Sequence, residues 1–330
     1  MSGKLKFAFY WNASCGGCEI AVLDINEKIL DVAALADIVL WPVAVDGKYK
    51  DIEAMEDGAI DVAFINGAVR NTDNLAMAQL LRRKSKVVVA FGTCAHLGGI
   101  PGLANLSRRD EIFERVYSDN AVNPEGTRPK PHTQVPEGEL ELPEFWNTVY
   151  PMGAVVEVDY YLPGCPPTPE SIAGAVTAIA TGNLPPRGAV LGTGTSTLCH
   201  SCPRVKEEKK VKAFQRIAFT APEPGRCLLE QGIVCLGSVT RDGCGARCVG
   251  ANMACRGCYG APDGVTDQGS RFLSILATVV DSNDPQEIKE ILSGVVDPVG
   301  YAYRFSLPSS LLVRRSQPRT QRVTVEEVAD

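Results

Sequence analysis

Residues 86–91 read KVVVAF, an almost uninterrupted apolar run that is followed directly by Gly92, Thr93 and Cys94. A short run rich in β-branched residues is typical of a strand buried on both faces in the interior of a parallel sheet. Apolar runs at 4–11, 38–43, 60–66 and 155–162 alternate along the chain with helical patterns at 19–35, 74–84 and 169–180. This alternation predicts an α/β fold with a doubly wound parallel sheet.

Four of the twelve cysteines follow three of these predicted strands. Cys15 and Cys18 follow strand 4–11, Cys94 follows strand 86–91, and Cys165 follows strand 155–162. Because the carboxyl ends of parallel strands share one edge of a sheet, we expect the four thiols to converge there. Four thiolates suit one iron–sulfur cubane. A lone CxxC pair would also suit a redox dithiol or half of a zinc site, and the matching positions of Cys94 and Cys165 favour the cluster.

The other eight cysteines crowd into residues 199–258, where Pro and Gly are frequent and regular structure is predicted to be sparse. One division places Cys199, Cys202, Cys227 and Cys235 in one site and Cys244, Cys248, Cys255 and Cys258 in another. Spacing alone leaves this partition open. Structural zinc is the main alternative, because two CxxC pairs also suit tetrahedral thiolate sites.

Length and composition limit the class of protein. The 330 residues, 45% of them apolar, have room for two domains, which we place at 1–183 and 184–330, with a loosely held tail from residue 314. No export signal precedes the first strand and no apolar stretch approaches membrane-spanning length, so we expect a cytoplasmic protein without a membrane span. Thiols stay reduced in the cytoplasm, which favours metal over disulfides. The net charge of −6 argues against a nucleic-acid partner.

Three further residues lie close to these cysteines. His200 is interpreted as a neighbour rather than a ligand, because cysteine already supplies four ligands per cluster. His96 is interpreted as a hydrogen-bond donor beside the first site. Glu19 is interpreted as a glutamate favoured in the first turn of a helix rather than as a proton relay. No catalytic residue is predicted in this chain.

Four segments carry a resemblance to a known family: WNASCGGCE at 11–19, AFGTCAHLGGIPGL at 90–103, YYLPGCPPTPE at 160–170, and TRDGCGARC at 240–248 followed by the pair Cys255 and Cys258. In these segments the chain strongly resembles the small, electron-transfer subunit of NiFe hydrogenases. The resemblance covers nearly the whole chain. It is greatest to the cytoplasmic, F420-non-reducing branch, which reduces methyl viologen and is associated with heterodisulfide reductase.

The resemblance implies a flavodoxin-like N-terminal domain and a loop-rich C-terminal iron–sulfur domain, with three 4Fe-4S clusters in all. It implies proximal ligands Cys15, Cys18, Cys94 and Cys165, medial ligands Cys244, Cys248, Cys255 and Cys258, and distal ligands Cys199, Cys202, Cys227 and Cys235. Many exported relatives have a histidine in place of Cys199, and their medial cluster often has only three cysteines. Full cysteine sets should lower the reduction potentials here, since histidine ligands raise the potential in Rieske centres.

The resemblance also implies that hydrogen is cleaved on a separate large subunit that holds the nickel–iron centre. Electrons would then pass from the proximal through the medial to the distal cluster. The acceptor would be an iron–sulfur adaptor with heterodisulfide reductase, or a flavoprotein that reduces F420. Apolar loops at 97–106 are the expected interface with the large subunit. An F420-reducing hydrogenase small subunit, a quinone-reductase subunit of the complex I lineage and a zinc structural module are the alternatives.

Overall fold

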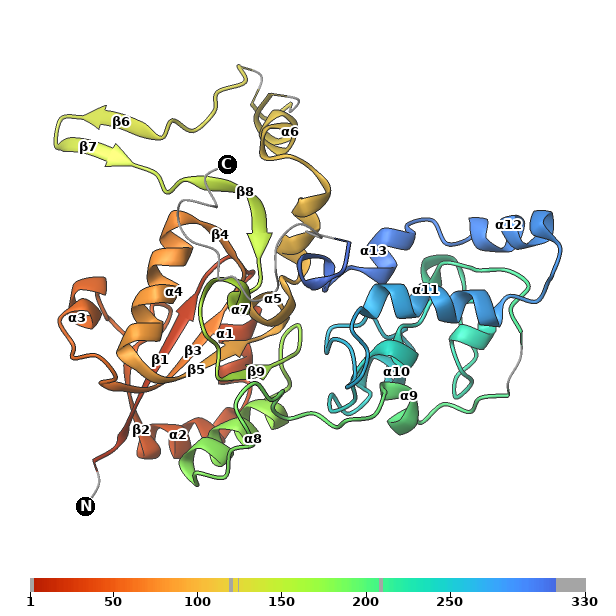
Figure 1. The fold of residues 1–330 in the computed structure, drawn as a ribbon, viewed down its shortest axis with the longest axis horizontal. Helices are drawn as coiled ribbons and strands as arrows, with labels where there is room; N and C mark the ends of the chain where they lie inside the picture. The colour runs from red at the N-terminus through yellow and green to blue at the C-terminus, as the bar shows by residue number, and fades with distance from the viewer. Residues whose placement is uncertain (1–2, 119–120, 124, 208–209, 313–330) are drawn as a thin grey trace.

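The computed structural model describes residues 3–118, 121–123, 125–207 and 210–312. Figure 1 shows a sheet covered by helices, joined to a second region of short helices and long loops. The predicted tail from residue 314 lies outside the described residues.

Five parallel strands form the sheet, in the order β2-β1-β3-β5-β9. They are β1 (Leu5–Trp11), β2 (Ala36–Leu40), β3 (Ile60–Asn66), β5 (Ser85–Phe91) and β9 (Tyr160–Leu162). Counted within the sheet alone, the order is 2-1-3-4-5, which is the flavodoxin-like arrangement. β5 contains the KVVVAF run and lies between β3 and β9. The predicted α/β class with a doubly wound parallel sheet is therefore confirmed.

Each face of the sheet packs against its own helices, because successive side chains of a strand point to opposite faces. Phe7 and Phe9 of β1 face the helices α1 (Gly17–Leu23), α2 (Ile29–Leu35) and α8 (Pro169–Ala180). Ala8 and Tyr10 face α3 (Tyr49–Glu53) and α4 (Thr72–Lys84). The predicted helices at 74–84 and 169–180 are confirmed, the first starting two residues earlier than expected.

Three of the predicted elements were wrong in extent. The expected helix at 19–35 is divided into α1 and α2, because Asn26 between them adopts a left-handed conformation with φ of 56°. The strand expected at 155–162 is shorter: Val155 ends α7 (Met152–Val155), residues 156–159 are irregular, and only β9 at the end is a strand. The strand expected at 38–43 is β2 and ends at Leu40.

The described part of the segment between α6 (Arg109–Phe113) and β8 (Phe145–Tyr150) lies mostly on the surface, as is usual for a connecting segment. It contains a hairpin of β6 (His132–Val135) and β7 (Gly138–Glu141), which extends from the sheet region in Figure 1. Both strands are exposed almost throughout. β8 itself pairs with β4 (Val69–Asn71) in a separate two-stranded sheet.

The C-terminal region has sparse regular structure, as predicted. Its helices are α9 (Leu198–Ser201), α10 (Arg247–Gly250), α11 (Gln268–Val279), α12 (Pro285–Ser293) and α13 (Pro298–Ala302). α11 and α12 begin at the side-chain caps Asp267 and Asp284. The boundary at 183/184 stays a prediction, and Leu184 and Leu191 pack in the core of the sheet region.

None of the helices in the described ranges is long and apolar enough to cross a membrane.

Candidate functional site

The first four cysteines lie at one edge of the sheet. Cys15 follows β1, and Cys18 lies in the first turn of α1. Cys94 lies in α5 (Thr93–Leu97), which comes directly after β5, and Cys165 follows β9. Cys18 and Cys94 are buried, whereas Cys15 and Cys165 are exposed. The structure therefore brings together the four residues that the topology of the sheet predicts.

The thiols of this set lie close enough to influence one another electrostatically. Burial and then the neighbouring thiols of Cys165 and Cys15 raise the pKa of Cys94 to about 12. Burial, Cys94, Cys165 and Cys15 raise the pKa of Cys18 well above its usual range. Metal binding has to displace the protons of such thiols, since thiolate is the form that binds a metal.

Two glycines leave room for these sulfurs. Gly92 has a φ of +82°, and a Cβ atom there would collide with the Cys18 sulfur. Gly99 has a φ of +58°, and its Cβ atom would lie 2.5 Å from the Cys94 Sγ atom. Both positions also favour glycine because an L side chain is strained at positive φ. At these two positions the backbone lies so close to the sulfurs that a residue with a side chain would not fit.

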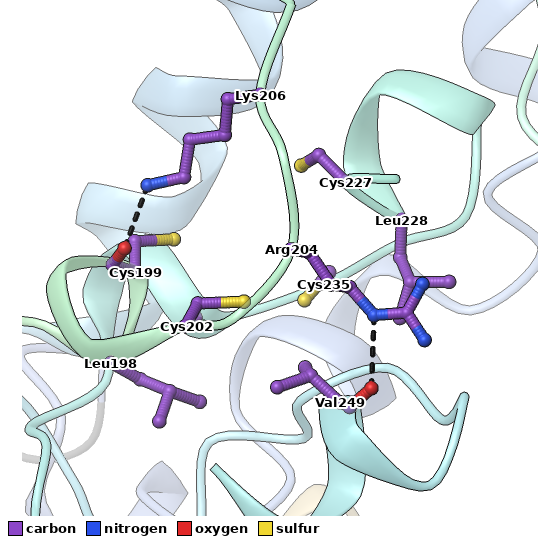
Figure 2. A pocket seen from close by; sticks show the side chains of 10 residues that line it. Leu198, Cys199, Cys202, Arg204, Lys206, Cys227, Leu228, Cys235 and Val249 are labelled. Carbon is purple, nitrogen blue, oxygen red and sulfur yellow. Dashed lines mark hydrogen bonds between the residues drawn. The ribbon is translucent and has the colours of Figure 1, made fainter. Parts of the chain in front are cut away.

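A second set of cysteines lines one pocket in the C-terminal region. The sulfurs of Cys199 and Cys202 face those of Cys227 and Cys235 across this pocket (Figure 2). Leu198, Leu228 and Val249 supply an apolar lining. Burial raises the pKa of the Cys199 thiol to about 12. The pocket unites the four residues that the sequence assigned to one of its two C-terminal sites.

The remaining four cysteines lie between these two sets. Burial, followed by the nearby thiols of Cys165, Cys244 and Cys248, raises the pKa of Cys258, which reaches about 12 although the Cys165 backbone N–H donates to its sulfur. Burial, followed by the nearby thiols of Cys235 and Cys258, also raises the pKa of Cys255. The thiols therefore form a continuous series from the sheet edge, through Cys258 and Cys255, to the pocket at Cys235.

The sheet region and the C-terminal region are hydrogen-bonded to each other beside this series. The Thr93 hydroxyl donates to the Cys258 carbonyl oxygen at 2.5 Å and accepts from the Gly164 N–H at 3.1 Å. The Gly99 N–H donates to the Phe305 carbonyl oxygen at 3.0 Å. These bonds hold the start of α5, with Cys94, next to the loops that contain Cys165 and Cys258.

The twelve cysteines are all free thiols. Among the residues that the structure describes, no three or more His, Cys, Asp or Glu side chains form a group suited to a single metal ion. A cubane cluster takes each thiolate on a different iron, and the gathered thiols together with the glycine spaces fit such a group. Analysis for iron, acid-labile sulfide and zinc distinguishes a cubane cluster from a zinc ion on the same thiolates.

The histidines and Glu19 have surroundings that the sequence did not predict in full. His200 is exposed, and His96 packs against the Tyr161 ring at 4.7 Å, its Nδ1 atom having no hydrogen-bond partner among the described residues. Glu19 lies in the first turn of α1, as expected, but it is buried and accepts hydrogen bonds from Trp41 Nε1 and Asn66 Nδ2. These partners come from distant segments, so no local signal could have identified them.

Two cations at the pocket were also missed. Arg204 and Lys206 line it together with the four cysteines. Their spacing of two and four residues from Cys202 was the available signal, since alternate residues of an extended segment lie on one side.

Comparison with known proteins places these features in a wider group. The family model described as "NADH ubiquinone oxidoreductase, 20 Kd subunit" matches residues 15–179. The chain is 41% identical over 322 residues to the iron-sulfur subunit of the F420-non-reducing hydrogenase of Archaeoglobus profundus, covering 94% of this chain and 98% of that protein. It is 37% identical over 327 residues to the corresponding F420-non-reducing hydrogenase subunit of Methanothermobacter thermautotrophicus, covering 96% and 99%.

Among solved structures, an NAD+-reducing NiFe hydrogenase in the H2-reduced state is 32% identical, with a TM-score of 0.47. That match covers 55% of this chain and 93% of the other.

Proposed function

The chain belongs to the family of F420-non-reducing hydrogenase iron–sulfur subunits, and from this premise we propose that it is the electron-transfer subunit of a NiFe hydrogenase. Hydrogen would be cleaved on a separate large subunit, and this chain would conduct the electrons away. The observation that carries the proposal is the continuous series of thiols from the sheet edge to the C-terminal pocket.

We assign the ligands of three 4Fe-4S clusters from this series. The proximal set is Cys15, Cys18, Cys94 and Cys165, the medial set is Cys244, Cys248, Cys255 and Cys258, and the distal set is Cys199, Cys202, Cys227 and Cys235. The single pocket lined by Cys199, Cys202, Cys227 and Cys235 supports the distal set, and the shared sheet edge of the first four cysteines supports the proximal set. Such clusters supply one-electron redox centres when bound. The role of the chain is to hold the clusters in the order proximal, medial, distal. Two pairs of neighbouring thiols support this order: Cys165 lies near Cys258, and Cys255 lies near Cys235.

The large subunit is proposed to cover the sheet edge at the exposed thiols of Cys15 and Cys165. Apolar side chains are exposed around this edge, with Trp11 41% and Ile20 61% accessible. The Trp11 ring lies against Gly16, next to Cys15. In the segment 97–106, where the interface was expected, Ile100 and Leu106 are exposed, whereas Leu103 packs on the C-terminal core.

The electron acceptor is proposed to be an iron–sulfur adaptor with heterodisulfide reductase. The names of the two relatives support this choice over an F420-reducing flavoprotein, because both are described as F420-non-reducing. A cytoplasmic location is proposed as well, supported by twelve cysteines that form no disulfide.

The experiment that tests the function is anaerobic purification of the chain with its copurifying partners, followed by iron, sulfide, nickel and zinc analysis and a hydrogen-dependent viologen reduction assay. We expect about twelve irons per chain, as three cubane clusters require, with nickel on a larger partner. Zinc without acid-labile sulfide would refute the proposal in favour of the structural module.

A further inference from the structure

We propose that Arg204 and Lys206 act as positive charges on the distal centre and hold its reduction potential above the value that four cysteine ligands alone would give. The inference rests on the proposed function, since it requires an iron–sulfur group on Cys199, Cys202, Cys227 and Cys235. It concerns two residues that supply no ligand.

The segment after Cys202 presents alternate residues to the pocket. Val205 forms a parallel bridge with Arg226, its N–H donating to the Gly225 carbonyl oxygen at 2.7 Å and its own carbonyl accepting from the Cys227 N–H at 2.8 Å. The pairing keeps the segment extended beside Cys227. Val205 is 61% exposed and points away, whereas Cys202, Arg204 and Lys206 line the pocket.

Arg204 is a buried cation, with only 8% of its surface accessible. Its Nε atom donates to the Val249 carbonyl oxygen at 2.9 Å, and its Nη1 and Nη2 atoms donate to the Arg226 carbonyl oxygen at 2.8 Å and to Asn252 Oδ1 at 2.5 Å. All of these acceptors are neutral. Within the described residues no carboxylate forms an ion pair with Arg204, although buried charges are normally paired.

Lys206 lies at the mouth of the same pocket. Its Nζ atom donates to the Cys199 carbonyl oxygen at 2.7 Å, so the ammonium group is held beside Cys199 in Figure 2. Its charge lowers the pKa of Cys199, against the larger effect of burial. No Asp or Glu of the described chain lines this pocket, whereas Glu230 and Lys210 both line the adjoining cavity, which shares Cys199, Cys227, Cys235 and Lys206 with it.

A centre with four thiolate ligands carries net negative charge and gains another on reduction. Nearby positive charge stabilises the reduced form more than the oxidised form, and net charge is one of the factors that set the potential of such centres. The anionic group would also supply the counter-charge that Arg204 otherwise lacks. The two cations thereby offset the lowering that follows from a cysteine, rather than a histidine, at position 199. An elevated potential at the last site favours movement of electrons toward the acceptor.

The test uses the anaerobically purified complex and an EPR redox titration of the distal centre. That centre is identified as the one whose signal is altered in Cys199→His, in which the potential should rise. In Arg204→Gln we expect the ratio of reduced to oxidised distal centre at a fixed solution potential to fall at least tenfold, which corresponds to about 59 mV for a one-electron couple. Lys206→Gln should shift the potential in the same direction but less, since Lys206 is exposed and screened.

Control variants distinguish the effect of the positive charge on the distal potential from the effect of a changed structure. Lys206→Arg and Arg204→Lys keep the charge and should retain the parent potential. Lys212→Gln removes an equal charge from a side chain that is 85% exposed and paired with Asp281, and should leave the potential unchanged. The shift in Lys206→Gln should shrink at high ionic strength, whereas that in Arg204→Gln should persist.

Iron and sulfide counts keep each outcome interpretable. An unchanged distal potential in Lys206→Gln at low salt, with full iron and sulfide, would overturn the role of Lys206. If Arg204→Gln and Arg204→Lys both lose the distal iron, Arg204 is a structural residue and its electrostatic role is wrong. Absence of iron and sulfide from the parent protein would instead refute the proposed function itself.

Discussion

Gly99 is the residue at which backbone conformation and cysteine chemistry depend on each other most directly. Its φ is positive, and a side chain there would enter the space of the Cys94 sulfur and of the Cys94 backbone. Gly174, within α8, has no atom within 4 Å of the position that a Cβ atom would take, and is therefore a matched comparison in the same part of the chain.

We expect Gly99→Ala to destabilise the protein by at least about 1 kcal/mol, because alanine at positive φ is strained, and to lose about four irons per chain as the proximal set is displaced. Gly174→Ala should retain all iron and should be slightly more stable, since alanine favours a helix over glycine. Iron analysis and thermal unfolding of both variants provide the check. Full iron content in Gly99→Ala would contradict the close approach to Cys94.

The convergence of the first four cysteines at one sheet edge could be predicted, because the strands before them are marked by apolar runs. The partners of Glu19 could not, since Trp41 and Asn66 come from other parts of the sheet region. The burial of Arg204 could not be predicted either. Arg204 lies in a polar stretch of the sequence, and its partners Val249 and Asn252 come from a distant segment.

At the scale of elements, α12 offers a test of local stability far from the cysteines. The Asp284 carboxylate accepts from the Gln286 and Glu287 N–H groups and so caps the helix. Asp284→Ala should lower the free energy of unfolding by about 1 kcal/mol, whereas Asp284→Asn should be nearly neutral, because asparagine caps as well as aspartate. Thermal unfolding measures the difference. Loss of iron from Asp284→Ala would show that α12 also supports a cysteine site.

The hairpin of β6 and β7 packs on no described core and is exposed on both strands. We expect replacement of residues 130–143 by a short Gly-Ser linker to leave the iron content and the thermal midpoint of the isolated chain unchanged, because little apolar surface is buried there. A linker replacing residues 72–84 should abolish folding, since α4 covers one face of the sheet. A marked drop in the midpoint after the hairpin replacement would mean that the hairpin stabilises the fold.

Elements with strong end signals were predicted well, and those without them were not. α8, for example, begins at the Thr168 cap with Pro169 in its first turn. By contrast, nothing in the pattern at 19–35 marks the left-handed Asn26 that separates α1 from α2. The apolar spacing there also misled, because Ile20, Leu23 and Leu30 are exposed while Ala21, Val22 and Val32 are buried.

At the scale of the whole molecule, the proximal and C-terminal sites should be separable. We expect Cys94→Ala to reduce the iron content from about twelve to about eight per chain and to abolish hydrogen-dependent viologen reduction by the assembled complex. Chemical reduction by dithionite should still generate the EPR signals of the two C-terminal centres, which serves as the internal control. Unchanged hydrogen-dependent reduction would refute the proximal assignment.

The fold class was the most predictable property, because the alternation of strands and helices indicates an α/β fold with a parallel sheet. The flavodoxin-like strand order was implied by the resemblance, and the sheet has that order. The contact between the two regions was not predictable, since it depends on single bonds between distant loops, such as that from Thr93 to Cys258. The resemblance implied the order of the three cysteine sets, and this contact, with Cys258 next to Cys165, supports it.

The first set is half open, with Cys15 and Cys165 exposed and Cys18 and Cys94 buried. If the proposed cluster forms on this set, its iron and sulfide would enter through the exposed side, which is also the side proposed to meet the large subunit. Because the docked large subunit would cover this side, iron and sulfide would have to enter before it binds. On the proposed assignment, the cluster at the sheet edge would have to form before the large subunit docks, and a chain that docked without iron would be sealed in an inactive form.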